Sequence, residues 1–168
     1  MKTKLMIDQL IGLLERENEI YQSMLVVIDK ERRAAVQSDL NELKNAAEEK
    51  ENIIVNLRRY EEQRIQLTRS MAEAYGYSFE EFTITKLARL VDEPYAGRLI
   101  QAKSDLSTVL NVVGDAGQRT KQLFEHSLEL LRGSLNLISE MTQISTVYYS
   151  SGNIQRTYQT GKCVDGEI

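Results

Sequence analysis

The sequence is poor in the residues that build catalytic and metal sites. Its 168 residues include one histidine, His126, one cysteine, Cys163, and no tryptophan. A di-iron bundle needs Glu-x-x-His pairs, but position 123, three residues before His126, is leucine. The lone cysteine excludes an internal disulfide and, with the lone histidine, a zinc site of cysteine and histidine ligands. We therefore expect no catalytic residues, no metal, no cofactor and no small-molecule substrate, and we predict that the protein is not an enzyme.

An excess of basic residues and a long apolar run are also missing. The 21 basic and 25 acidic residues are spread along the chain, whereas nucleic-acid-binding proteins concentrate positive charge on one face. The nearest basic cluster, Arg58, Arg59 and Arg64, is interrupted by two glutamates and is expected to be a solvated helix face. There is no uncharged apolar run of about 18 residues, which predicts no membrane span. Because charges are frequent near the start, we expect no signal peptide. We expect a soluble cytoplasmic protein with no nucleic-acid partner.

Proline is almost absent, since Pro94 is the only one. Apolar residues recur at spacings of three and four along most of the chain, which is the period of an amphipathic helix. They form three stripes: Ile7, Leu10, Leu14, Tyr21, Met24 and Ile28; Leu40, Leu43, Ala47, Ile54, Leu57, Met71 and Tyr75; and Leu99, Leu106, Val113, Phe124, Leu131, Ile138 and Met141. Such stripes are buried against one another. The sequence therefore predicts an all-α fold, an elongated up-down antiparallel bundle or coiled coil of three long helices plus one short helix, with no obvious pocket.

Capping residues predict where the first two helices begin and end. The first helix is expected over about residues 3–35, and Ser38-Asp39 supplies N-cap chemistry for a second helix from Leu40. An unbroken helix through Ser38 is the alternative, because no glycine or proline enforces a turn. Tyr75-Gly76 places glycine where a left-handed C-cap residue belongs, so the second helix should end there.

The connection after Gly76 is expected to hold the short helix. Ser78-Phe79-Glu80-Glu81 has the pattern of a capping box, flanked by Tyr77 and Phe82 as a hydrophobic staple, and predicts a helix start at Ser78. The expected anchors of this helix are Leu87, Leu90 and Val91. Pro94 would then lie in the first turn of a third helix of about 55 residues.

Two pairs of residues interrupt the apolar stripes. Glu17 and Glu31 occupy positions that the heptad would give to apolar residues, and we expect both at the edge of the stripe with the carboxylates in water. We expect a kink of the third helix at Gly114 and Gly117, although close packing of a neighbouring helix would also explain them.

The helical pattern stops after Tyr149, and the remaining residues are polar, aperiodic and punctuated by glycine. We therefore predict a helical bundle domain over residues 1–149 and a flexible C-terminal tail over residues 150–168.

The last helix carries two apolar stripes where one would suffice for a single partner. The first stripe contains Leu123, Leu130, Leu137, Met141, Ile144 and Tyr148, and the second contains Phe124, Leu128, Leu131, Leu135, Ile138 and Tyr149. They are offset by about 100° around the helix axis. Either this helix is central and packs on two neighbours, or one stripe is reserved for another protein. Ser127 and Ser134 would allow close backbone approach along the first stripe. Since adjacent tyrosines cannot both face one neighbour, Tyr148 or Tyr149 is expected to be exposed and to belong to an interface.

Several segments together resemble a known family, the FlgN-like flagellar export chaperones. The resemblance begins with Leu13-Leu14-Glu15-x-Glu17-x-x-x-Tyr21 and continues with Ser38-Asp39-Leu40-x-x-Leu43 and Glu49-Lys50-Glu51. It ends with Ser127-Leu128 in a long last helix followed by tyrosine and glycine. Where such proteins often have paired asparagines before the final Ser-Leu, this chain has Asp115 and Gln118.

The resemblance implies a chaperone that holds C-terminal helical segments of hook-filament junction proteins, of the FlgK and FlgL type, and delivers them to the export gate. It places the binding region on the last helix. We predict that a client helix binds along the second stripe, at the partner-binding residues Phe124, Leu128, Leu131, Leu135, Ile138 and Tyr149. Tyr148, at the end of the first stripe, is predicted as a further partner-binding residue. The competing interpretation is a structural or signalling coiled-coil protein that self-associates through its last helix.

Overall fold

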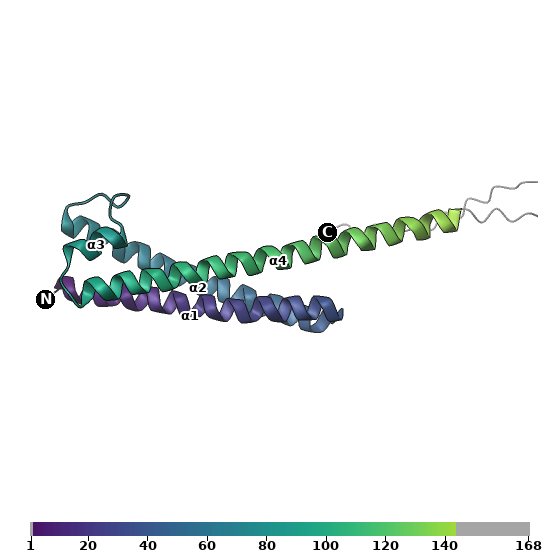
Figure 1. Cartoon of the computed structure of the whole chain (residues 1–168), viewed down its shortest axis with the longest axis horizontal. Coiled ribbons are helices and arrows are strands. Elements are labelled where there is room, and N and C mark those ends of the chain that lie inside the picture. The colour runs from purple at the N-terminus through teal and green to yellow at the C-terminus, as the bar shows by residue number, and fades with distance from the viewer. Residues whose placement is uncertain (1, 144–168) are drawn as a thin grey trace, which may run out of the picture. The chain divides into compact units, whose positions relative to one another are not determined.

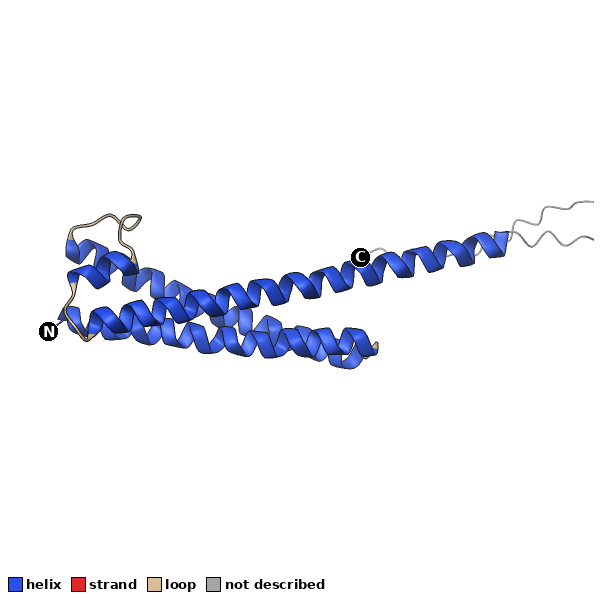
Figure 2. Ribbon diagram, viewed as in Figure 1, coloured by secondary structure: helices blue, strands red, loops and turns tan. Residues whose placement is uncertain are grey.

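The computed structural model describes residues 2–143, which form four α-helices and no strand (Figures 1 and 2). These are α1 (Lys2–Gln37), α2 (Leu40–Tyr75), α3 (Ile84–Leu90) and α4 (Tyr95–Gln143). The prediction of an all-α fold with three long helices and one short helix is confirmed. The chain divides into two compact units, residues 1–124 and 125–168. The predicted tail and the boundary before it lie outside the described residues and stay predictions.

The turn between α1 and α2 reverses the chain at Ser38-Asp39. Ser38 adopts a left-handed backbone conformation with φ of 56°. The Asp39 carboxylate then accepts hydrogen bonds from the backbone N–H groups of Asn41 (3.1 Å) and Glu42 (3.0 Å), two donors that the first turn of α2 leaves without carbonyl partners. The predicted N-cap is confirmed, and the alternative of an unbroken helix is wrong. α1 and α2 therefore pack side by side as an antiparallel hairpin (Figure 1).

The end of α2 is confirmed, but the predicted start of the next helix is wrong. Gly76 is left-handed, with φ of 74°, and caps α2. The chain then makes a single turn in which the Phe82 N–H donates to the carbonyl of Ser78 (3.2 Å). Helix α3 starts only at Ile84, with the Thr83 hydroxyl accepting from the Lys86 N–H (3.2 Å).

Burial of Phe82 accounts for this later start. Its ring is buried, lies 5.7 Å from the Tyr75 ring and 6.0 Å from the Tyr77 ring, and anchors the connection in the core. The expected staple contact thus forms without the helix that it was expected to begin. Among the predicted anchors, Leu87 is fully buried and Val91 packs partly against the core, whereas Leu90 is exposed, contrary to expectation.

The start of α4 is held by the acidic residues before it. The Glu93 carboxylate accepts from the Gly97 N–H (3.2 Å), and the Asp92 carbonyl accepts from the Tyr95 N–H (3.1 Å). Pro94 precedes the helix by one residue and is not within its first turn. The Arg98 guanidinium donates to the Asp8 carboxylate of α1 (2.8 Å), so α1 and α4 begin at the same end of the bundle.

One hydrophobic core joins all four helices within residues 1–124. Its fully buried side chains come from α1 (Leu10, Ile11, Leu14), α2 (Met71), α3 (Leu87) and α4 (Leu99). Burying one such side chain contributes about 1.5–3 kcal/mol, so this cluster is the main source of stability.

The inner face of α2 differs from the predicted stripe. Leu40, Ala47 and Ile54 are exposed, whereas Ala46 is buried. Leu43 and Leu57 of the predicted stripe are half-buried, but Lys50 and Arg64 also lie on the inner face. A stripe built from apolar residues alone is therefore only partly right over the first half of the helix. The physical reason is that α1 offers carboxylates opposite these two cations.

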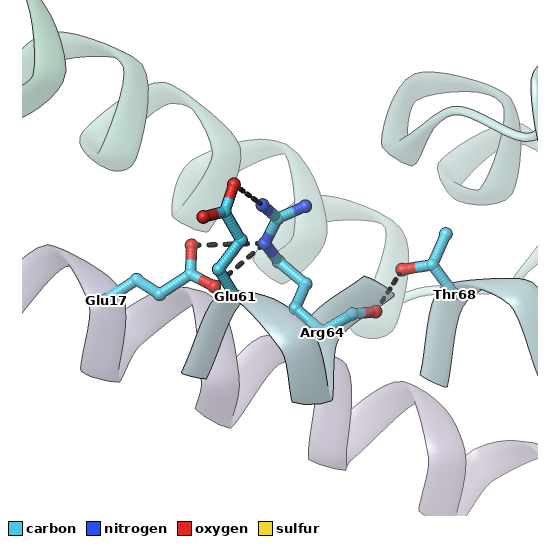
Figure 3. Close-up of polar contacts among 4 residues, drawn as sticks. All are labelled: Glu17, Glu61, Arg64 and Thr68. Atoms are coloured by element: carbon cyan, nitrogen blue, oxygen red, sulfur yellow. Dashed lines mark hydrogen bonds and ion pairs between the residues drawn. The ribbon is translucent and has the colours of Figure 1, made fainter. Parts of the chain in front are cut away.

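Glu17 and Glu31 of α1 have largely buried, ion-paired side chains, so the expectation that their carboxylates lie in water is wrong. Arg64 Nε donates to both carboxylate oxygens of Glu17, at 2.8 and 3.1 Å, and the Glu17 side chain is 5% exposed (Figure 3). Lys50 Nζ lies 2.7 Å from the Glu31 carboxylate, whose side chain is 12% exposed. Arg64 is therefore not part of a solvated face as predicted, although Arg58 and Arg59 are exposed.

The two ion pairs are spaced identically on the two helices. Glu17 and Glu31 are two heptads apart on α1, and Lys50 and Arg64 are two heptads apart on α2. An antiparallel hairpin shifted by one heptad would place these charges opposite apolar residues. Burial is the largest influence on Glu17 and raises the pKa of its carboxyl despite the attraction of Arg64. Because buried ion pairs often add little net stability, we expect these pairs to act mainly by favouring one alignment of the hairpin.

Helix α4 runs without interruption through Gly114 and Gly117. A Cβ atom added at either glycine would meet no atom within 4 Å. Close packing of a neighbouring helix therefore does not explain these glycines. Across residues 2–143, none of the helices combines the length and apolar character that a membrane span requires.

Candidate protein-binding surface

The predicted binding residues of the second stripe lie on the C-terminal part of α4. Phe124 is half-buried, and Leu128, Leu131, Leu135 and Ile138 are between 52% and 64% exposed. Their alternating spacing of four and three residues places them along one face of the helix. Tyr148 and Tyr149 lie outside the described residues. Four large apolar side chains on one exposed helix face are costly to leave in water, which makes this face a candidate for binding another protein.

The first stripe is exposed over the same stretch. Leu130 and Leu137 are 60% and 61% exposed, while Leu123 is half-buried. Every side chain from Glu125 to Glu140 is exposed. Whether this part of the helix packs on two neighbours or binds another protein stays a prediction.

The first stripe extends a pattern that is buried earlier in the same helix. Spacings of three and four alternate without a break along α4 through Leu99, Ala102, Leu106, Val109, Val113, Ala116, Thr120, Leu123, Ser127, Leu130, Ser134 and Leu137. Most members up to Thr120 are buried, and those from Ser127 onward are exposed. The same heptad that packs in the core thus continues into a surface available to a partner.

The second stripe becomes continuously apolar only from Phe124 onward. At the corresponding heptad positions earlier in α4 lie Lys103, Ser107, Gly114, Gly117 and Lys121, with Ile100 and Leu110 as apolar exceptions. The extra apolar stripe is therefore largely confined to the part of the helix whose side chains are exposed. An amphipathic helix needs only one stripe to pack in its own bundle, so this addition points to a contact beyond the bundle.

The serines of the first stripe present little side-chain bulk. Ser134 Oγ donates to the Leu130 carbonyl of its own helix at 2.9 Å. Its hydroxyl is satisfied within α4, and a partner packing there would not have to supply a hydrogen bond.

Polar residues occupy the remaining face of this part of α4. At 100° per residue, Glu125, Glu129, Arg132, Asn136 and Glu140 fall on the side away from the two stripes. Leucine, glutamate and arginine favour helix, whereas Gly133 costs about 1 kcal/mol relative to alanine. The segment therefore combines good helix formers with a sharply divided apolar and polar surface.

The surface offers little for catalysis or metal binding. His126 is exposed. Across residues 2–143, no three histidine, cysteine, aspartate or glutamate side chains gather where they could hold a metal ion. A shallow hollow of about 360 Å³ between α1 and α2 is lined by Gln9, Gly12, Leu13, Gln63 and Leu67, which carry no ionisable group. The exposed stripes can bind apolar surface but have no chemistry to perform on it.

Comparison with known proteins supplies the family. A family model described as FlgN protein matches residues 1–156. No match was found among curated proteins or among solved structures.

Proposed function

Because the chain belongs to the FlgN family of flagellar export chaperones, which are not enzymes, we propose that it binds C-terminal helical segments of hook-filament junction proteins along the second stripe of α4. The family implies binding of flagellar export substrates such as hook-associated proteins. The observation that carries the finer proposal is the exposure of Leu128, Leu131, Leu135 and Ile138 on one helix face.

An amphipathic client helix would complete the burial of this face. Its apolar side chains would pack between those of the second stripe, as in other complexes in which a helix lies in a groove, and a few large anchors would supply most of the affinity. The client's own assembly surface would be covered in the same step. This is how the chaperone would prevent premature assembly before delivering the client, in the cytoplasm, to the export gate.

Aspartate at Leu131 or Leu135 tests the proposal. Because these side chains are about 60% exposed, the substitutions should leave the fold intact. In the complex they would place an unpaired charge against apolar surface, so client binding should weaken by about 2–4 kcal/mol. The measurement is a calorimetric titration with the purified C-terminal segment of a hook-filament junction protein from the same bacterium, together with a thermal melt of each variant.

Asn136→Asp is the matched control, since it adds the same charge to the same helix on its polar face. It should bind as the unsubstituted protein does. Normal melting of Leu131→Asp with unchanged client affinity would refute the second stripe as the binding site.

Self-association is the second candidate, because exposed stripes with heptad spacing are also what a coiled-coil dimer needs. Light scattering across a concentration series separates the two. A monomer that binds the client supports the chaperone site, whereas a tight dimer abolished by Leu131→Asp would assign the stripe to a second copy.

A further inference from the structure

We infer that the client covers both stripes of α4 at once, so that two helices of one client molecule pack against residues 123–138. This inference rests on the proposed function and specifies the kind of partner that the site takes. It begins from the exposure of both stripes over the same residues, with Leu130 and Leu137 on the first and Leu131 and Leu135 on the second.

The width of the apolar face is the first argument. The stripes are offset by one residue, or about 100°, and together with their flanks they span roughly half of the helix circumference. A single partner helix in a coiled coil covers one stripe of alternating three- and four-residue spacing. Neighbours at about 90° around a helix are the geometry of a four-helix bundle, in which each helix contacts two others.

The N-terminal part of helix α4 shows how many neighbouring helices one apolar stripe can pack against. Between Leu99 and Val109 a single stripe is buried, in a cluster that contains side chains of both α1 and α2. A single stripe of α4 is therefore wide enough to pack in a core formed with two neighbouring helices. A face with two stripes is wider than that, and a lone client helix would leave one row of leucines in water.

Continuity with the bundle is the second argument, and it concerns the first stripe. Its members Ser127, Leu130, Ser134 and Leu137 continue the heptad that α4 buries from Leu99 to Thr120. The spacing typical of helix packing is thus kept over residues whose side chains are exposed. The small serines alternating with leucines suit a closely approaching helix, as Ala102 and Ala116 do earlier in α4.

Both helices are assigned to one client molecule because the stripes run alongside each other. They begin at Leu123 and Phe124 and cover the same length of helix, about 21 Å at 1.5 Å per residue. Two occupants would therefore also touch one another. Helices of one chain lose their translational freedom once, whereas two separate molecules would each lose it.

The test compares charge substitutions in the two stripes. Leu130→Asp and Leu137→Asp alter the first stripe, Leu131→Asp and Leu135→Asp alter the second, and Asn136→Asp is the control. Each is titrated with a full-length hook-filament junction protein from the same bacterium, with thermal melts and light scattering on every variant. We expect first-stripe and second-stripe variants each to weaken binding by tenfold or more, with roughly unchanged melting. The milder Leu130→Ser replaces any aspartate variant that melts early.

The outcomes separate this inference from the function on which it rests. If the unsubstituted protein does not bind the client, the proposed function fails. If it binds and only second-stripe variants weaken binding, the function stands and the two-helix client is refuted. If first-stripe variants abolish a dimer and leave client affinity unchanged, a second copy occupies the first stripe and the inference is equally refuted.

Discussion

Two parts of helix α4 share the same heptad spacing, but the side chains at these positions are mostly buried in one part and exposed in the other. From Leu99 to Thr120 its members are mostly buried, and several are small, such as Ala102 and Ala116. From Ser127 to Leu137 the same spacing continues, its apolar members are leucines, and every side chain is exposed. A heptad therefore predicts that a helix packs against something, but it does not say whether the partner belongs to the same chain.

The hairpin of α1 and α2 makes the complementary point. There, four heptad positions hold the charged residues Glu17, Glu31, Lys50 and Arg64, in two pairs with carboxylates that are largely shielded from water. Charges lie inside the hairpin, while leucines of α4 lie in water. The two exceptions have different expected roles: we expect the buried charges to favour one alignment of the hairpin, and we propose that the exposed leucines bind a client.

Truncation of one leucine in each part of α4 should give the largest contrast in stability. Leu99 is fully buried, so Leu99→Ala should reduce the free energy of unfolding by about 2–5 kcal/mol through lost burial and a residual cavity. Leu131→Ala should change it by less than about 0.5 kcal/mol. Urea denaturation followed by circular dichroism measures both. Equal losses would mean that the exposed stripe is part of the core.

Removing Arg64 from its ion pair with Glu17 should have the next largest effect on the free energy of unfolding. Arg64→Leu leaves the shielded Glu17 carboxylate without its partner, and we expect a loss of about 3 kcal/mol. The double variant Glu17→Leu/Arg64→Leu removes both charges and should recover most or all of this loss. If the double variant is no more stable than Arg64→Leu, the pair contributes net stability and its role in alignment is not the dominant one.

The pH dependence of the Arg64→Leu variant sharpens the same point. Burial raises the folded-state pKa of Glu17 above the ordinary value of 4.5, and losing Arg64 removes an influence that lowers it. A carboxyl whose folded pKa is raised favours folding when protonated, and this contribution is lost as the pH rises through the folded pKa. The loss in free energy of unfolding caused by Arg64→Leu, relative to the unsubstituted protein, should therefore be smaller at pH 5 than at pH 8. A deficit that grows on acidification would contradict the assignment to Glu17.

The smallest expected effects concern the glycines of α4. Gly114→Ala and Gly117→Ala place a methyl group where no atom lies within 4 Å, so each should stabilise the protein by about 0.5–1 kcal/mol. Gly133→Ala, in the exposed part, should raise helicity with little change in global unfolding. Destabilisation by either of the first two variants would indicate a bend that alanine disfavours.

Local signals predicted much of the fold. Asp39 and Gly76 cap α2 as expected, because capping depends on a few neighbouring backbone groups. The capping-box pattern at Ser78 failed because burial of Phe82 is a tertiary effect that outweighs local preference. The inner face of α2 was predicted only in part, because Lys50 and Arg64 can be assigned to it only when their ion-pair partners on α1 are known. Their matching two-heptad spacing was the available signal.

The candidate site was predictable only in part. Spacing identified the two stripes, but exposure at Leu128 or Leu135 could not follow from spacing, since Leu106 shows the same pattern and is buried. The role of the second stripe in client binding stays a prediction, and Tyr148 and Tyr149 lie outside the described residues.

Hydrogen exchange measured by mass spectrometry, with and without a hook-filament junction protein, tests the central claim most directly. In the free protein, amides of residues 125–140 should exchange much faster than those around Leu10 and Met71. Client binding should slow exchange across residues 125–140 and leave the hairpin of α1 and α2 unchanged. Protection that appears on the hairpin while residues 125–140 keep exchanging as in the free protein would contradict a client-binding surface on α4.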